Sequence, residues 1–429
     1  MSSEQAQVGN ELYALAKELF PICRSITGEG FRRTLEILRR EAPGLTVHSV
    51  PSGTQAFDWQ VPDEWNIRGA HILDPKGRKV VDFADSNLHV VGYSVPVDRE
   101  LSLEELQPHL HSLPGQPDAI PYVTSYYNRT WGFCLTHRRR RAMKKGRYRV
   151  VIDSTLAPGL LNYGEILLPG RLDKEVLLST YCCHPSTANN ELSGPVVTAR
   201  LARWLSELPS RRYSYRIVFI PETIGSIVYL SRHLPELKAK VVAGFNVTCV
   251  GDDRAYSYLP SRQGDTLADR AAIHAIQAIA PKFKRYTYLD RGSDERQYCS
   301  PGADLPVATL MRSKYGSYPE YHTSKDDLSL ISPKGLYGGF AVIRRALQLL
   351  EANETWRATF PCEPQLGKRG LYPTLSIKAA KTTAPSILDF LAYCDGTRDL
   401  LSIAETIGSD ALQLADIAST LAAAGLLYN

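Results

Sequence analysis

The sequence contains no pair of cysteines in a CxxC spacing, although it has eight cysteines in 429 residues. Without such pairs there is no signature of a structural zinc knot, and cysteines spread along a chain of this length do not describe a disulfide framework. We therefore expect free thiols. Cys182 and Cys183 precede His184, and we interpret them as buried, inert thiols rather than nucleophiles.

The sequence also lacks any apolar run of the roughly 20 residues that are needed to cross a bilayer. Its polar start, MSSEQAQVGNE, has neither the basic nor the apolar part of a signal peptide. The net charge of +5 is modest, and we interpret the one dense basic run, HRRRRAMKKGR at residues 137–147, as a solvated turn. These absences predict a cytoplasmic protein that binds neither membranes nor nucleic acid.

The composition is that of a globular protein, with 44% apolar and 22% charged residues, and the length predicts two or three domains. Apolar residues at helical spacing predict helices over residues 10–19 and 31–41. Residues 51–146 contain short, aromatic, β-rich patterns. From residue 147 onward, short apolar runs alternate with helical patterns, which predicts an α/β domain with a largely parallel sheet.

Candidate site residues follow the predicted strands, which is where ligands bind in an open α/β sheet. The run EVLLSTYCC leads into His184, and the run RIVFIP leads into Glu222. The loops on either side of the strand LPVATLM contain Asp294 and Glu295 before it and His322 after it. Because the carboxyl ends of parallel strands meet at one edge of a sheet, we expect these side chains to share a site.

Two imidazoles with several carboxylates are the ligands that zinc prefers in a catalytic site. Such an ion lowers the pKa of a bound water and polarises a carbonyl, while a carboxylate accepts the proton. Glu222 is the candidate base. Arg24, in the turn PICRSITGEG, and Tyr321, beside His322, are candidates for holding a substrate.

The motifs HPSTANNELSG, PETIGSIVYL, GSDERQY and YPEYHTSKDDL resemble the bacterial aminopeptidase-like family, which is related to the co-catalytic zinc aminopeptidases and to glutaminyl cyclases. The resemblance extends upstream through PICRSITGEG and FDWQVPDEWN, and downstream into a tail that resembles winged-helix modules. It implies an α/β domain of the zinc aminopeptidase type over residues 1–50 and 147–360, a β-rich insert domain over 51–146, and a winged-helix domain over 380–429.

Four positions depart from the zinc aminopeptidase pattern. Asn190 stands where an aspartate that bridges two metals is expected, and Thr223 stands where the second of two glutamates is expected. An aspartate is also expected near Thr248, and Glu295 takes the place of the histidine in an SDH motif. Two dications about 3.5–4 Å apart need anions between them, and an amide bridges them poorly. The sequence therefore argues against an intact two-metal site.

A single zinc ion needs fewer anions and is the simpler interpretation. Its candidate ligands are His184, His322 and one of Glu191, Glu222 and Glu295. If Glu222 is a ligand, Glu295 becomes the candidate base. The alternative is that no metal binds and that the pocket only recognises a ligand.

The sequence and the resemblance together predict a zinc-dependent hydrolase of an amide or peptide bond, of the aminopeptidase or deacylase type. Its expected substrate is a small or peptide-like molecule, and the resemblance adds a role in tailoring a natural-product or polysaccharide intermediate. The candidate substrate contacts are Asn190, Asp294, Tyr321 and Arg24. The rival is a metal-free module that binds a peptide or another ligand. Whether the protein is a homo-oligomer is left open.

Overall fold

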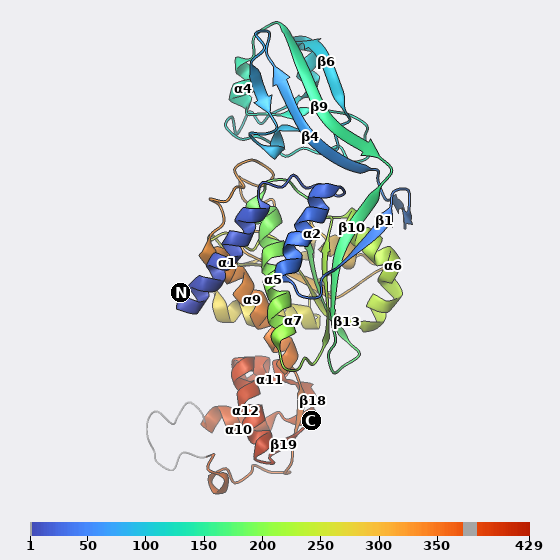
Figure 1. Ribbon diagram of the computed structural model, residues 1–429. Helices are drawn as coiled ribbons and strands as arrows, with labels where there is room; N and C mark the ends of the chain where they lie inside the picture. The colour runs from blue at the N-terminus through green and yellow to red at the C-terminus, as the bar shows by residue number, and fades with distance from the viewer. Residues whose placement is uncertain (1, 372–383) are drawn as a thin grey trace. The chain divides into compact units, whose positions relative to one another are not determined.

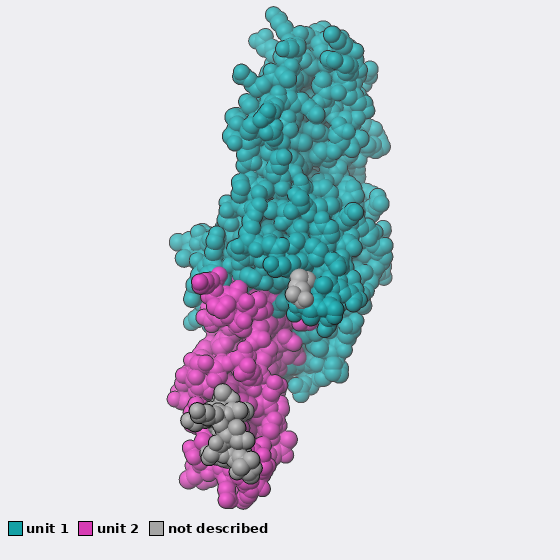
Figure 2. All heavy atoms as spheres, turned by 90° about the vertical axis from the view of Figure 1, so that its left-hand side faces the viewer, with its two compact units in different colours: residues 1–268, 283–341 teal, residues 269–282, 342–429 magenta. Residues whose placement is uncertain are grey.

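The computed structural model describes residues 2–371 and 384–429 (Figure 1), which fall into two compact units (Figure 2). Unit 1 comprises residues 1–268 and 283–341, and unit 2 comprises residues 269–282 and 342–429. The start of the predicted winged-helix range, residues 380–383, lies outside the described residues. Among the helices of the described part, none combines the length and the apolar character that a membrane span requires.

An eight-stranded mixed sheet forms the core of unit 1, in the order β1-β10-β12-β11-β13-β16-β14-β15. Its strands are β1 (Thr46–Pro51), β10 (Leu160–Leu168), β11 (Glu175–Tyr181), β12 (Ser214–Ile220), β13 (Val241–Asn246), β14 (Ser257–Leu259), β15 (Lys284–Arg285) and β16 (Val307–Met311). The four central strands β12, β11, β13 and β16 are parallel, whereas β10 and β14 run antiparallel to them. Every residue of β11 is buried, as expected for a strand covered on both faces. The predicted fold class is confirmed.

Helices alternate with these strands along the chain. They are α1 (Ser3–Leu19), α2 (Glu29–Glu41), α5 (Ser193–Glu207), α6 (Ile224–Lys240), α7 (Leu267–Ile279), α8 (Glu295–Tyr298) and α9 (Pro333–Ala352). Helix α1 begins earlier than the predicted residue 10 because Ser2 and Gln5 form a capping box at its start. Helix α2 has buried Phe31, Leu35 and Leu38 on one face, which is the spacing that predicted it.

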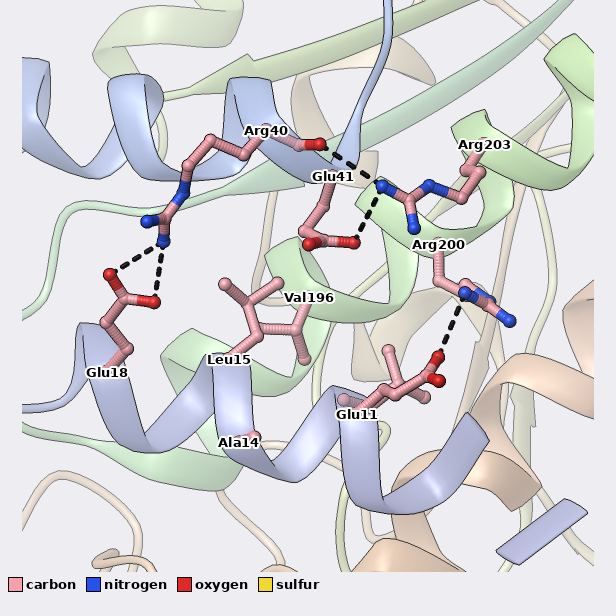
Figure 3. A pocket seen from close by; sticks show the side chains of 10 residues that line it. Glu11, Ala14, Leu15, Glu18, Arg40, Glu41, Val196, Arg200 and Arg203 are labelled. Atoms are coloured by element: carbon pink, nitrogen blue, oxygen red, sulfur yellow. Dashed lines mark hydrogen bonds and ion pairs between the residues drawn. The ribbon is translucent and has the colours of Figure 1, made fainter. Parts of the chain in front are cut away.

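Three ion pairs link α1, α2 and α5 around a hollow of 390 Å³ (Figure 3). They are Arg40–Glu18 at 2.6 Å, Arg203–Glu41 at 3.1 Å and Arg200–Glu11 at 3.1 Å. Leu15 and Val196 lie between them. Each arginine that lines this hollow therefore has a carboxylate partner, and its charge is balanced.

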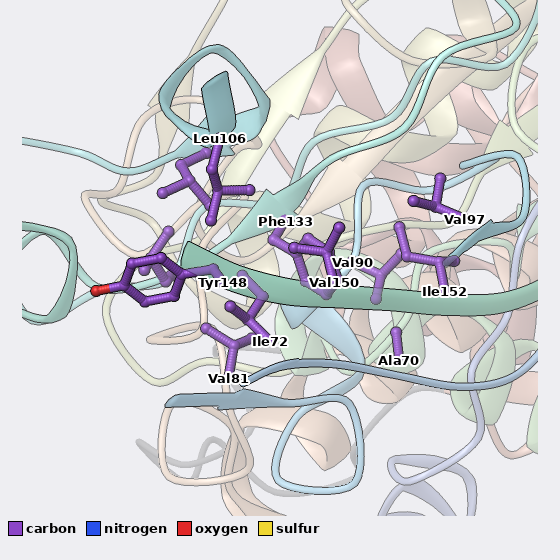
Figure 4. Close-up of a cluster of buried hydrophobic side chains, with 12 residues drawn as sticks. Ala70, Ile72, Val81, Val90, Val97, Leu106, Phe133, Tyr148, Val150 and Ile152 are labelled. Carbon is purple, nitrogen blue, oxygen red and sulfur yellow. The ribbon is translucent and has the colours of Figure 1, made fainter. Parts of the chain in front are cut away.

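The β-rich segment forms a second, antiparallel sheet in the order β5-β4-β9-β6. Its strands are β4 (Glu64–Leu73), β5 (Lys79–Asp82), β6 (Val97–Ser102) and β9 (Arg147–Ala157), and shorter elements are β2 (Gln55–Ala56), β3 (Trp59–Gln60), α3 (Leu103–Leu106), β7 (Leu110–His111), β8 (Phe133–Cys134) and α4 (His137–Ala142). Alternate residues of β9 point into an apolar cluster that includes Ile72, Phe133, Tyr148 and Val150 (Figure 4). The basic run predicted as a turn contains helix α4.

Besides most of α7 and the second half of α9, unit 2 contains a three-stranded sheet, β18-β17-β19, and three further helices in the described residues. The elements are β17 (Thr355–Ala358), α10 (Ala384–Ala392), β18 (Asp395–Asp399), α11 (Leu400–Ile407), α12 (Ala411–Ala423) and β19 (Leu427–Tyr428). Asp399 caps α11 by accepting a hydrogen bond from Ser402 N, and it pairs with Arg270 at 2.9 Å. This arrangement confirms the predicted winged helix.

Candidate active site

His184 lies just beyond the end of β11 and is almost completely buried. A π-helical turn, η3 (Ala188–Leu192), follows it and leads directly into α5. This turn carries Glu191, whose Oε2 lies 2.5 Å from His184 Nδ1. π-Helical turns are common at functional sites, and a carboxylate on one ring nitrogen fixes the orientation of the other. Nε2 of His184 is therefore the nitrogen left for chemistry.

Glu222 follows β12, and its Oε2 lies 3.6 Å from His184 Nε2. Burial raises the pKa of Glu222, and the charge of Glu191 raises it further, against the opposite effect of His184. Burial lowers the pKa of His184, but the charge of Glu191 and their hydrogen bond outweigh burial and raise that pKa above its ordinary value. The predicted residues His184, Glu191 and Glu222 thus lie together, with the imidazole between two carboxylates.

His322 comes from the loop before α9, and its ring centroid lies 5.3 Å from that of His184. It stacks on Tyr321 at 3.9 Å. Within the described part of the chain, its buried Nε2 has no hydrogen-bond partner. Burial, followed by the charge of His184, lowers the pKa of His322 to about 3. His322 is therefore a neutral imidazole at pH 7, with a lone pair for a ligand.

Tyr122, from the β-rich segment, completes the site. Its ring meets His184 and His322 edge-on, at centroid distances of 4.8 Å and 5.2 Å. Its N–H donates to the carbonyl of His322 at 2.8 Å, and its hydroxyl lies 3.0 Å from that of Tyr126. Neither tyrosine was predicted, because the aromatic stretch YVTSYYN is the only local signal and nothing in it indicates a contact with residues 62 and 200 positions away.

The backbone of the site adopts unusual conformations. The φ angles of Thr223, His322 and Tyr126 are 65°, 56° and 39°. Positive φ is uncommon outside glycine and is a genuine outlier for a β-branched residue such as threonine. Such conformations persist where the surrounding fold enforces them, and they cluster at functional sites. The strained positions mark the same site as the polar side chains.

Glu295 is held by hydrogen bonds from three segments of the chain. It accepts hydrogen bonds from Gly292 N at 2.8 Å, Ser293 N at 3.0 Å, Tyr315 Oη at 2.5 Å and Asn246 Nδ2 at 2.9 Å. Both carboxylate oxygens are occupied by donors. A role for Glu295 as base or ligand stays a prediction, and these contacts favour a structural role instead.

Asp294 is fully buried at the start of α8. Its Oδ1 accepts hydrogen bonds from Thr223 N at 2.7 Å and from Ser226 Oγ at 2.8 Å. Burial, followed by the charge of Glu222, raises the pKa of Asp294 to about 8. Asp294 is therefore protonated at neutral pH and positions the turn that carries Glu222, while its predicted contact with a substrate stays untested.

The other predicted substrate contacts lie deeper. Asn190 Oδ1 accepts a hydrogen bond from Tyr181 Oη at 2.9 Å, and that hydroxyl lies 2.6 Å from Thr248 Oγ1. Two positions that depart from the zinc aminopeptidase pattern are thus bridged by one tyrosine. Arg24 is 1% exposed and donates from Nε to the carbonyl of His184 at 3.1 Å. Arg24 therefore holds the backbone of His184, and the ring of Tyr321 stacks on that of His322.

Two sets of side chains could hold a metal. Donor atoms of Cys183, His184 and Glu191 lie within 4.8 Å of one another, but burial raises the pKa of the Cys183 thiol well above its usual value. Nε2 of His184, Nε2 of His322 and the carboxylate of Glu222 are the second set, but in the described residues these donors do not all lie within 4.8 Å of one another, so this set would have to close around an ion. The unpartnered Nε2 of His322 fits this set, because a buried imidazole nitrogen without a donor or ligand is costly. Two imidazoles and one carboxylate are a catalytic zinc set.

Comparison with known proteins places the chain in context. A family model described as a domain of unknown function, DUF4910, matches residues 13–353, and a winged helix-turn-helix model matches residues 354–429. A Clostridium acetobutylicum protein, named for polysaccharide biosynthesis and an aminopeptidase-like domain, is 46% identical over 368 residues, covering 86% of this chain and 84% of that protein.

Solved structures extend this comparison to the fold. A crystal structure from Clostridium acetobutylicum, described as that of a peptidase, has a TM-score of 0.93 at 42% identity and covers 99% of this chain and 97% of its own. A zinc aminopeptidase from Bacillus subtilis has a TM-score of 0.57 at 13% identity, covering 79% of this chain and 94% of its own. The second likeness shows the fold alone.

Proposed function

We propose that this chain, which belongs to the DUF4910 family, hydrolyses an amide or peptide bond at a single zinc ion. The observations that support the proposal are the pair of His184 Nε2 and Glu222 beyond two strand ends, and the unpartnered Nε2 of His322 in the loop beside them. The same fold occurs in zinc aminopeptidases. His184, His322 and Glu222 would hold the ion.

The surrounding residues have distinct roles in this proposal. A zinc ion supplies a water of lowered pKa and polarises the substrate carbonyl. Glu191 accepts a hydrogen bond from Nδ1–H of His184. The proton then stays on Nδ1, and the lone pair of Nε2 is left for the metal. Glu222 would hold the ion through the oxygen nearer His184, and its other oxygen would accept the proton of the water. Tyr122 excludes water from the two rings.

The proposed substrate carries an acylated or peptidyl amine. The relative from Clostridium acetobutylicum is named for polysaccharide biosynthesis, which supports an intermediate of that kind of pathway over a housekeeping peptide. A natural-product intermediate with the same amide chemistry fits equally, because the donors recognise the scissile amide rather than its carrier.

Metal analysis of protein purified without a histidine tag tests this proposal. We expect about one zinc per chain, and no zinc in a His184→Ala, His322→Ala double variant. Glu222→Gln should slow the release of amines from a panel of acylated amino sugars and peptides by at least about 100-fold. Glu207→Gln, at an exposed position near the end of α5, is the matched control.

Binding of a ligand without hydrolysis is the second candidate. It is favoured by Asn190 and Thr248, which replace acidic residues and are bridged by Tyr181. Wild-type protein without zinc, together with a Glu222→Gln variant that behaves like wild type, would replace the hydrolase proposal with this one.

A further inference from the structure

A second hollow lies on the β-rich segment of unit 1, among α4, the β4–β5 turn and the start of β9. Its volume is 480 Å³. The lining residues are Asp74, Pro75, Lys76, Arg78, Val80, Arg139, Ala142, Met143, Lys144, Lys145 and Tyr148. We call this surface the basic hollow, because five of these residues are cationic and one is acidic.

The single acid does not neutralise the hollow. Asp74 accepts hydrogen bonds from the backbone of Lys76 and Arg78 and pairs with the guanidinium of Arg78 at 2.6 Å. The ion pairs of the described residues include none made by Lys76, Arg139, Lys144 or Lys145. Four exposed cations therefore face one cavity without a counter-charge.

The hollow in Figure 3 is the informative contrast. There the three lining arginines each have a glutamate at 2.6–3.1 Å, so that surface needs no ligand. Like charges gathered without partners repel one another, and an anion that enters the cavity relieves this repulsion. Of these two hollows, the basic hollow is the one with cations that have no acidic partner in the described residues.

The backbone that carries these cations is fixed. Thr136 caps α4, and the guanidinium of Arg140 holds the helix by donating to the side chain of Gln107 at 2.9 Å. The hydroxyl of Tyr148, whose ring belongs to the cluster in Figure 4, donates to the carbonyl of Lys144 at 2.7 Å. Val80 and Met143 form an apolar floor. The cations therefore surround a preformed cavity and are not spread over a flexible tail.

The shape of the surface selects the kind of ligand. A membrane surface needs projecting apolar residues, and among the described residues none of the exposed large hydrophobic side chains lines this hollow. A duplex needs an extended basic track, whereas a cavity of a few hundred Å³ suits a small molecule. Exposed lysine and arginine side chains bind phosphate through charge-assisted hydrogen bonds.

We propose that the basic hollow binds the phosphate group of a small anionic ligand, through Lys76, Arg139, Lys144 and Lys145. The ligand is either an inorganic phosphate compound or an ester whose apolar part lies on Val80 and Met143. This inference is independent of the proposed hydrolysis, because it uses none of the residues of the candidate active site.

Isothermal titration calorimetry of the full chain, in about 0.15 M KCl to screen diffuse charge, tests the proposal with two probes, inorganic pyrophosphate and octyl phosphate. We expect saturable binding of at least one probe. A variant with Arg139→Gln, Lys144→Gln and Lys145→Gln should bind the probe about tenfold more weakly. A loss of that size is expected when a few charge contacts, each weakened by salt, are removed together. A control variant with Lys17→Gln, Arg33→Gln and Arg99→Gln removes the same charge from exposed positions elsewhere in unit 1.

The two probes distinguish the sources of the phosphate. Tighter binding of pyrophosphate supports an inorganic ligand, and tighter binding of octyl phosphate supports an ester with an apolar part. Either result requires that the control variant bind within about twofold of wild type. Absence of saturable binding by both probes, or an equal loss in the two triple variants, overturns the proposal, since binding would then depend on net charge alone.

Discussion

The two histidines of the candidate site lie in opposite surroundings. On the strand side, His184 has a carboxylate near each ring nitrogen, at 2.5 Å and 3.6 Å. On the loop side, His322 is covered by the rings of Tyr122 and Tyr321, and its Nε2 has no partner in the described residues. The pKa of His184 is raised, whereas that of His322 is lowered to about 3.

Burial lowers the pKa of both imidazoles, so the raised pKa of His184 is due to the carboxylates that face it. Carboxylates stabilise the charged form of His184, whereas burial and the charge of His184 keep His322 neutral. In a shared site, the carboxylates beside His184 supply negative charge and fix the orientation of its ring. His322 supplies a neutral imidazole nitrogen.

Glu191→Gln should have the largest effect, because it removes the carboxylate that holds His184. Glutamine keeps the size and one acceptor but removes the charge that holds His184 and faces the buried Arg24. Loss of such a partner of a metal-binding histidine costs about 10- to 100-fold in metal affinity. Zinc competition against a chromogenic chelator measures this affinity.

Glu18→Gln is the control for Glu191→Gln. It removes a carboxylate from a half-exposed ion pair with Arg40, which contributes little to the fold. Zinc affinity of the Glu191→Gln variant equal to that of the control would show that Glu191 only packs against His184.

Asp294→Asn should change the pH dependence of stability, because Asp294 is a buried acid near Glu222. Its pKa is about 8 in the folded protein and 3.8 when it is unperturbed, so between these values the folded state binds more protons than the unfolded state. Stability therefore falls as pH rises through this window, and asparagine, which stays neutral, removes that part of the loss. Urea unfolding measures the free energy of unfolding at each pH. Between about pH 6 and about pH 8, this free energy should fall in the Asp294→Asn variant by on the order of 1–2 kcal/mol less than it falls in wild type.

That measurement needs protein treated with a chelator, so that bound metal does not alter the titration. Asp265→Asn, at an exposed position of unit 1, is the control and should keep the wild-type pH dependence. An Asp294→Asn variant with the same pH dependence as wild type would show that Asp294 is ionised in the folded protein.

The sequence predicted the parts of the fold that depend on local pattern. Strands β11 and β12 are continuous apolar runs, and the rule that sites form beyond strand ends brought His184 and Glu222 together. The antiparallel neighbours, such as β10 beside β1 and β12, were not predicted. Their place depends on which strand completes the edge of the sheet, and a single run of residues does not encode its partner.

The site was predicted only as far as its residues lie at strand ends. Tyr122 comes from the β-rich segment and reaches the histidines because Pro121 pairs with Thr323 across a long sequence separation. Glu295 looked like a base because it is acidic and adjoins the site, yet its four donors come from three separate segments. Such contacts are set by tertiary packing, which a motif does not show.

The smallest expected effect concerns the aromatic side, where Tyr122→Phe and Tyr126→Phe remove the same partly buried hydrogen bond. Each variant should lose about 1 kcal/mol of unfolding free energy, and the double variant should lose less than the sum, because the two hydroxyls share one interaction. Zinc content should stay that of wild type in all three, since the ring of residue 122 still covers His184 and His322 in phenylalanine. Loss of zinc from Tyr122→Phe but not from Tyr126→Phe would assign the Tyr122 hydroxyl to the metal site, and the loop side would then not be a purely aromatic wall.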